Sequence, residues 1–174
     1  MNAIITITDI RELRRIPNQV EWTGDFENYV IEAQRFDIRP FLGDAMFYDM
    51  MENLTSAVYV DLLDGTEWTY AENTIQFDGL RVALAYFSFA RYIQSNNVFM
   101  TRYGLVTKST EHSEPVDEKT IARLVSQARN AANAIIEQAK LFLNNNIAVY
   151  TLWNSAASNK PRWGSKLKCI TNYD

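Results

Sequence analysis

The spacing of apolar residues between positions 117 and 143 constrains the fold more than any other feature. They recur three and four positions apart: Ile121, Leu124, Val125, Ala128, Ala131, Ala132, Ile135, Ile136, Ala139, Phe142 and Leu143. This periodicity predicts one amphipathic helix, which begins at the N-cap residue Asp117 and ends at Asn144–Asn146. At 1.5 Å per residue the helix is about 40 Å long. Its apolar face needs other helices to cover it, so we expect a mainly α protein built as a helical bundle.

Other stretches with helical spacing supply the partner helices. We predict helices from Thr8 or Asp9 to Arg15, over 25–36, over 38–53 and from about Thr74 to Asn97. Pro40 fits the first turn of a helix, so the second and third helices are either joined at a kink or form one bent helix. The alternating run Ile4–Thr8 favours a short strand, and an extended arm fits it equally well.

Two segments between the helices are expected to be non-helical. Asp64-Gly65 is a dipeptide that accepts positive φ in tight turns, and the β-prone segments Tyr59–Val60 and Trp68–Tyr70 flank it. A small β-hairpin with this turn is therefore predicted. Residues 98–116 are predicted to form an extended polar loop, and loops of this length are usually functional or ordered by a partner. The loop contains three candidate partner-binding residues: Arg102, Tyr103 and Lys108.

The chain changes character after Trp153. Residues 154–159 are typical of a flexible linker. The last sixteen residues, 159–174, hold four basic side chains and one acidic side chain, a net +3, whereas residues 1–158 hold 13 basic and 20 acidic side chains, a net −7. We therefore predict a helical domain over 1–153 and an extended C-terminal interaction arm over 154–174. A basic arm on an acidic body can dock on an acidic neighbour, including another copy of the same chain.

The arm supplies most of the candidate partner-binding residues. They combine positive charge with aromatic rings: Lys160, Arg162, Trp163, Lys166, Lys168 and Tyr173. Tryptophan and arginine dominate binding hot spots, so Trp163 is a candidate anchor on a partner. Packing of Trp163 back onto its own domain is an equally good interpretation.

The residue types that catalysis needs are scarce and scattered. The single histidine, His112, lies in the polar loop, and the single cysteine, Cys169, lies in the arm. The glycines stand apart, and no His/Cys spacing suits zinc. Two pairs of acids are close in sequence: Asp44 with Asp49, and Asp61 with Asp64. Such pairs are more typical of solvated faces than of acid–base catalysis, so we expect no catalytic, cofactor or metal site and interpret the chain as a non-enzyme.

The apolar runs are short. None approaches the roughly 18 to 20 apolar residues that a membrane span needs. The first residues lack the basic and apolar regions of a signal peptide. We therefore expect no membrane association and a cytoplasmic site of synthesis.

Three segments together resemble a known family. They are Phe26–Met51 (FENYVIEAQRFDIRPFLGDAMFYDMM), Tyr59–Ile93 (YVDLLDGTEWTYAENTIQFDGLRVALAYFSFARYI) and Thr101–Asp117 (TRYGLVTKSTEHSEPVD). In this order, ahead of a long last helix, they resemble the head–tail connector (adaptor) proteins of tailed bacteriophages, including ring proteins of crAss-like phages. The resemblance covers roughly residues 8–150 and is most specific over Glu32–Asp44, Leu63–Gly65 and Tyr103–Lys108. No catalytic motif carries it, and the arm sequence departs from the family.

The resemblance implies a ring of subunits, commonly about twelve, beneath the portal of the virion. In this role the chain links capsid to tail, DNA passes transiently through the lumen, and no small-molecule substrate or cofactor is needed. The partners would be other copies of the chain, the portal protein and a further tail or ring protein, and the arm would clamp one of them. The chain would be made in the cytoplasm of the bacterial host and would lie in the neck or connector region of the virion. The alternative is a small helical DNA-packaging accessory or regulatory binding protein, whose DNA affinity would reside in the basic arm.

Overall fold

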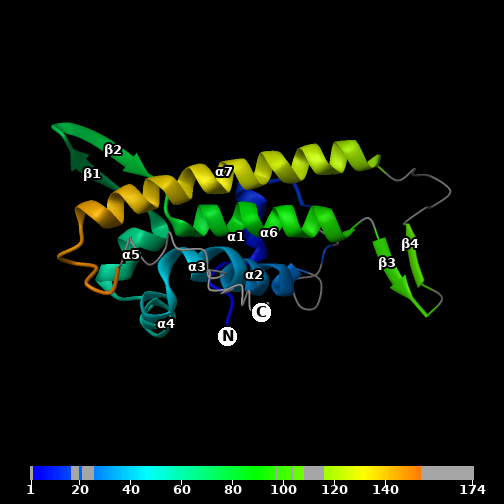
Figure 1. Cartoon of the computed structure of the whole chain (residues 1–174), viewed down its shortest axis with the longest axis horizontal. Helices are drawn as coiled ribbons and strands as arrows, with labels where there is room; N and C mark the ends of the chain where they lie inside the picture. The colour runs from blue at the N-terminus through cyan, green and yellow to red at the C-terminus, as the bar shows by residue number, and fades with distance from the viewer. Residues whose placement is uncertain are drawn as a thin grey trace, which may run out of the picture.

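Two antiparallel helices, α6 (Leu80–Asn96) and α7 (Glu118–Asn145), pack side by side in the computed structural model, and α6 lies between α7 and the helices nearer the N-terminus (Figure 1). The structure describes residues 2–16, 20, 26–96, 98–102, 104–107 and 116–153. The mainly helical fold predicted from the sequence is confirmed, with its long last helix and a small antiparallel hairpin.

The long helix begins and ends close to the predicted positions. The Asp117 side chain accepts a hydrogen bond from the Thr120 backbone N–H at 2.9 Å, so Asp117 is the N-cap. The buried side of α7 combines small and large residues: Ala128, Ala132, Ile135, Ala139, Phe142 and Leu143. The small residues allow α6 to pack closely along α7.

Helix α6 begins later than predicted, because residues 73–77 form a strand. Strand β1 (Thr66–Tyr70) pairs with β2 (Asn73–Phe77) in a hairpin whose turn lies at Ala71 and Glu72, both with positive φ. Phe77, whose spacing suggested a helix, is a buried strand residue stacked 5.3 Å from the ring of Phe142. Gly79, at φ +89°, separates the hairpin from α6.

The predicted position of the hairpin, with its turn at Asp64-Gly65, is wrong, because the observed hairpin begins only after Gly65. Tyr59 and Val60 belong to helix α5 (Ala57–Asp64), and Gly65 ends this helix rather than forming the hairpin turn. Gly65 does adopt the positive φ, +89°, that the dipeptide indicated. Positive φ serves a helix end as well as a hairpin turn, so the local signal alone did not distinguish them.

Residues 26–52 form a nearly continuous helical run. Helix α2 (Glu27–Ala33) passes directly into a π-helical segment, η2 (Gln34–Ile38), and then into α3 (Arg39–Leu42). Pro40 lies in the first turn of α3 as predicted, but the helix does not stop before it. The Arg39 N–H bonds the carbonyl of Gln34, five residues back, a wider turn that accommodates the missing N–H of proline. The break comes at Gly43, φ +80°, before α4 (Asp44–Glu52).

The predicted strand at Ile4–Thr8 is wrong. Helix α1 (Ile7–Leu13) already begins within it, and Thr6 caps this helix in a box with Asp9. Ile4 and Ile5 are buried, and the Ile4 N–H donates to the buried side chain of Gln34 at 2.7 Å. A side chain therefore satisfies the backbone group that a neighbouring strand would otherwise bind.

The predicted loop over 98–116 contains a second hairpin. Strands β3 (Val98–Thr101) and β4 (Gly104–Thr107) pair antiparallel beyond the end of α6, and residues 108–115 lie outside the described residues. The two hairpins lie at opposite ends of α6 (Figure 1).

The chain turns back after α7 and is anchored at Trp153. The indole N–H of Trp153 donates to the Asn144 side chain at 2.8 Å, and its ring lies 5.3 Å from that of Phe41. Trp153 is buried and is the last described residue. The linker and arm predicted over 154–174 lie outside the described residues.

Candidate functional site

Of the predicted partner-binding residues, the described part of the chain contains only Arg102. It directly follows β3 and is exposed. The others, Tyr103, Lys108, Lys160, Arg162, Trp163, Lys166, Lys168 and Tyr173, lie outside the described residues, as do His112 and Cys169. The candidate surfaces that the structure describes lie on the body, residues 1–153.

A cavity lies where the base of the β1–β2 hairpin meets α1, α6 and α7. Its volume is about 670 Å³, within the range of small-molecule binding clefts. Apolar and small side chains from three helices line one part of it: Leu13, Val82, Tyr86, Ala131, Ala134 and Ile135. Exposed polar and acidic side chains line the rest: Asp64, Glu67, Gln76, Asp78 and Gln138. We call this cavity the acidic groove.

Two glycines bring the acidic side of the groove together. A Cβ on Gly65 would lie 2.3 Å from the Phe77 carbonyl oxygen, and one on Gly79 would lie 2.5 Å from the Gly65 nitrogen. The residues that enter and leave the hairpin are therefore in backbone contact, which only glycine permits. This contact places Asp64 and Asp78, fourteen positions apart in the chain, on the same cavity.

The opposite wall is one face of α7. Ala131, Ala134, Ile135 and Gln138 follow the i, i+3, i+4, i+7 spacing of a single helix face. Larger side chains in place of Ala131 and Ala134 would fill part of the cavity. Because these two residues are small, the groove extends along the surface of α7.

Among the described residues, the groove lining has three carboxylates and no basic side chain. Two arginines lie beside it. Arg81 forms an ion pair with Asp64 at 3.0 Å, and the Arg14 guanidinium lies 5.0 Å from the centre of the Tyr86 ring. Glu67 and Asp78 are exposed at the lining itself, so this end of the groove favours a positively charged occupant with an apolar part.

A second surface is apolar and lies where the chain turns after α7. Four side chains there are exposed: Val58, Ile147, Val149 and Leu152, with Ile147 and Val149 more than half exposed. Three of them border a smaller cavity of about 250 Å³. We call these four residues the tip patch; exposed apolar groups of this kind mark interaction surfaces.

Two tyrosines hold the residues beneath the tip patch. The Tyr150 hydroxyl donates to the Val58 carbonyl at 2.7 Å, and the Tyr59 hydroxyl donates to Asp49. Burial, with a smaller contribution from the charge of Asp61, raises the pKa of Tyr150 to about 12. Burial and the hydrogen bond to Asp49 also raise the pKa of Tyr59. Both phenols are therefore neutral donors at physiological pH.

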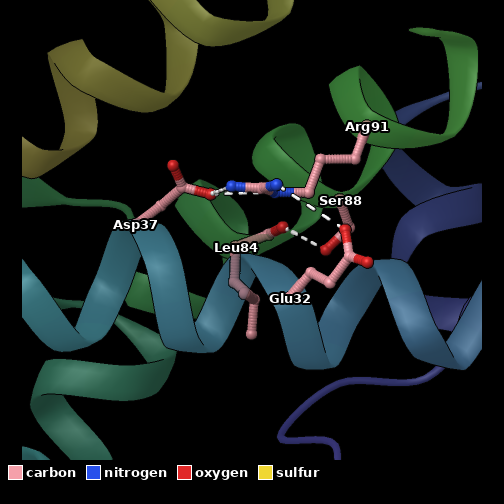
Figure 2. A network of polar contacts seen from close by, with 5 residues as sticks. All are labelled: Glu32, Asp37, Leu84, Ser88 and Arg91. Carbon is pink, nitrogen blue, oxygen red and sulfur yellow. Dashed lines mark hydrogen bonds and ion pairs between the residues drawn. The ribbon is translucent and has the colours of Figure 1, made fainter. Parts of the chain in front are cut away.

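An ion-pair network joins α6 to the π-helical segment (Figure 2). Arg91 reaches Asp37 at 2.7 Å and Glu32 at 3.6 Å, and its guanidinium lies 5.6 Å from the ring centre of Phe36. Phe36 itself is 64% exposed. The single guanidinium offsets the charge of the closer carboxylate, Asp37, partly screens that of Glu32, and lies against an exposed aromatic ring.

Three of the four acids that lie close in sequence bind separate partners. Asp44 pairs with Arg39 at 2.9 Å, Asp49 accepts from Tyr59, and Asp64 pairs with Arg81. Within the described ranges, no group of three or more His, Cys, Asp or Glu side chains is arranged to hold a metal ion. No helix in this part of the chain is both long and apolar enough to cross a membrane.

A family model matches residues 38–162, well over half of the chain. It describes a family of unknown function, DUF6712, and the chain belongs to this family. No curated protein and no solved structure matches the chain.

Sequence reasoning missed the acidic groove. Its carboxylates come from α5, β1 and the segment after β2, and its apolar wall comes from three helices. The local signals that could have suggested it are Gly65, Gly79 and the small residues of α7. None of them indicates that the hairpin base and α7 lie side by side.

Proposed function

We propose that the chain is a structural subunit of a ring that forms the head–tail connector of a tailed bacteriophage. The observation that carries this proposal is the placement of two hairpins at opposite ends of one helix pair (Figure 1). The resemblance of residues 8–150 to connector proteins supplies the identity of the assembly.

The hairpins offer unpaired strand edges. Among the described residues each hairpin is a two-stranded sheet, so every one of these strands has an edge that pairs with no further strand. Such edges accept a strand from another chain, and an assembly subunit protects them by burying them against its neighbour. Hairpins at both ends suit contacts made above and below a ring, or on both sides of a subunit.

The charge distribution supports a conduit. Residues 1–158 carry a net −7, and DNA passes most freely along a wall that does not bind phosphate. The arm, with its net +3, suits an acidic protein neighbour in a head-to-tail contact. In this role the neighbours are further copies, the portal protein and a tail or ring protein of the virion, and the function needs no cofactor.

The test is direct. The purified chain, alone and mixed with the portal protein of the same phage, is imaged by negative-stain electron microscopy, and virions are analysed by mass spectrometry and reconstruction. Closed rings and density for this chain between portal and tail are expected. Absence of the chain from purified virions would overturn the proposal.

The alternative, a DNA-packaging accessory or regulatory protein, is favoured by one observation, the four basic residues of the arm. It predicts DNA binding that weakens steeply with salt and disappears when residues 159–174 are deleted. A connector subunit binds duplex DNA weakly with or without the arm, so an electrophoretic mobility assay at two salt concentrations separates the two functions.

A further inference from the structure

We propose that the acidic groove is the docking site for the C-terminal arm, residues 159–174, of a second copy of this chain. This inference rests on the self-assembly in the proposed function and goes beyond it by naming both contact surfaces.

The chemistry of the two surfaces is complementary. The groove exposes Glu67 and Asp78 beside an apolar wall of small residues on α7. The arm carries four basic residues around Trp163, with one acidic residue at its end. An indole fits a cleft of about 670 Å³ whose α7 wall includes Ala131 and Ala134, and flanking lysines and arginine match the carboxylates.

The point where the chain leaves the body favours a second copy as the source of the arm. Trp153 is held by Asn144, whereas the groove uses Gln138 and residues before it on α7. Six residues correspond to about 120° around a helix, so Asn144 and the groove lie on different faces of α7. Trp153, the last described residue, is therefore held at a face of α7 other than the groove face, which favours the groove of a neighbouring copy over the arm's own.

The contact is head-to-tail. Each copy offers one arm and one groove, which are different surfaces, so the interaction repeats from copy to copy until a ring closes. DNA is a poor competitor for the groove, because phosphates are repelled by its carboxylates.

Thiol crosslinking tests the docking, because Cys169 of the arm is the only cysteine in the chain. A tagged chain with Ala134→Cys and Cys169→Ser is co-expressed with the untagged native chain, and a flexible bismaleimide is added. We expect a covalent tagged–untagged dimer. The matched control is Asn133→Cys with Cys169→Ser, since Asn133 is also exposed on α7 but does not line the groove. It should crosslink at least about fivefold less, because it points about 100° away around the helix.

Two crosslinking results would overturn the inference. The first is that native mass spectrometry detects oligomers while Ala134→Cys does not crosslink to Cys169 of another copy. The chain would then self-assemble, but through a contact other than the groove. The other is an intrachain crosslink that predominates when Ala134→Cys is combined with the native Cys169, which would place the arm on its own groove. Absence from virions would instead remove the connector role and leave the crosslink unaffected.

Charge reversal gives an independent readout. Glu67→Lys with Asp78→Lys should raise the dissociation constant of the oligomer about tenfold or more, as deletion of residues 159–174 should. Combining the groove reversal with Lys160→Glu, Lys166→Glu and Lys168→Glu should restore assembly. Glu72→Lys, at the exposed turn of the same hairpin and outside the groove, is the control. Equal effects of the groove and turn substitutions, or no rescue, would contradict the docking.

Discussion

Arg91 of α6 donates two hydrogen bonds to the same carboxylate oxygen of Asp37, from Nε at 3.1 Å and from a terminal nitrogen at 2.7 Å (Figure 2). The two residues are 54 positions apart, and both side chains are less than one-fifth exposed. This pair fixes the π-helical segment to the central helix at the point where Pro40 interrupts regular hydrogen bonding.

Removal of the arginine should destabilise the fold. Arg91→Leu leaves the Asp37 carboxylate partly buried without its cation, and we expect the free energy of unfolding to fall by about 1–3 kcal/mol. Arg91→Lys keeps the charge, loses the two-pronged donor and should lose less. The control is Arg35→Leu on the exposed side of η2, which makes the same charge change. Urea unfolding compares the three, and equal losses for Arg91→Leu and Arg35→Leu would contradict the role of the pair.

Two glycines with the same backbone conformation should respond differently to alanine. Gly43 (φ +80°, ψ 157°) and Gly65 (φ +89°, ψ 160°) occupy a region that only glycine enters readily, at a cost of about 1–3 kcal/mol for other residues. A Cβ on Gly43 meets open space, whereas one on Gly65 meets the backbone of Phe77. Gly65→Ala should therefore cost about 1–3 kcal/mol more than Gly43→Ala in urea unfolding. Similar losses would show that the close approach at the hairpin base is not maintained in solution.

The N-terminus of α7 should depend on the ionised form of Asp117. Hydrogen bonds from Thr120, side chain and backbone, lower the pKa of the Asp117 carboxyl. Its stabilising contribution is therefore present above the pKa of the unfolded chain and is lost as the pH falls through the lower pKa of the folded protein. Asp117→Ala should speed hydrogen exchange in the first turn of α7 at neutral pH and remove this acid dependence. Asp117→Asn retains a capping oxygen, so it should exchange more slowly than the alanine variant.

Alkaline pH should destabilise the protein through its buried phenols. The pKa of Tyr150 is raised to about 12, so the folded protein holds this proton more tightly than the unfolded chain does. Stability is complete below the ordinary tyrosine pKa of about 10 and falls as the pH rises from 10 towards 12. Tyr150→Phe should remove part of this decline, and Tyr59, whose pKa is also raised, should retain the rest.

The same substitution has a cost at neutral pH. Tyr150→Phe loses the hydrogen bond to the Val58 carbonyl, worth about 1 kcal/mol. Tyr70→Phe, on the exposed face of β1, is the control for loss of a phenol. Urea midpoints at pH 7, 10 and 11 measure both effects, and an unchanged alkaline slope in Tyr150→Phe would contradict the assignment.

Helix α7 illustrates what was predictable. Its apolar spacing, the cap at Asp117 and the end at Asn144–Asn146 all lie within its own sequence, and the structure agrees with each. Helical periodicity and caps are local properties, because residues three and four apart meet on the same helix face. The mainly helical class follows from the same signals.

The segment from Gly65 to Leu80 illustrates what the sequence alone could not predict. Phe77 and Leu80 have helical spacing, yet Phe77 lies in a strand because its ring stacks on Phe142 from a helix 65 positions away. Likewise Pro40 suggested a kink, whereas the helical run continues past Pro40 through a π-turn and breaks only at Gly43.

The sequence by itself determined the helical class, the long capped helix, the positive φ at Gly65 and the charge contrast between body and arm. Only the tertiary structure decided that Gly65 ends a helix, that the hairpin follows it, and that three carboxylates and two alanines of α7 line one groove. The physical reason is the distance along the chain over which the interacting residues are separated. Spacing and capping depend on neighbours within one turn, whereas the groove depends on backbone contact between Gly65 and Gly79 and on the packing of α7 over the hairpin base, which no local pattern specifies.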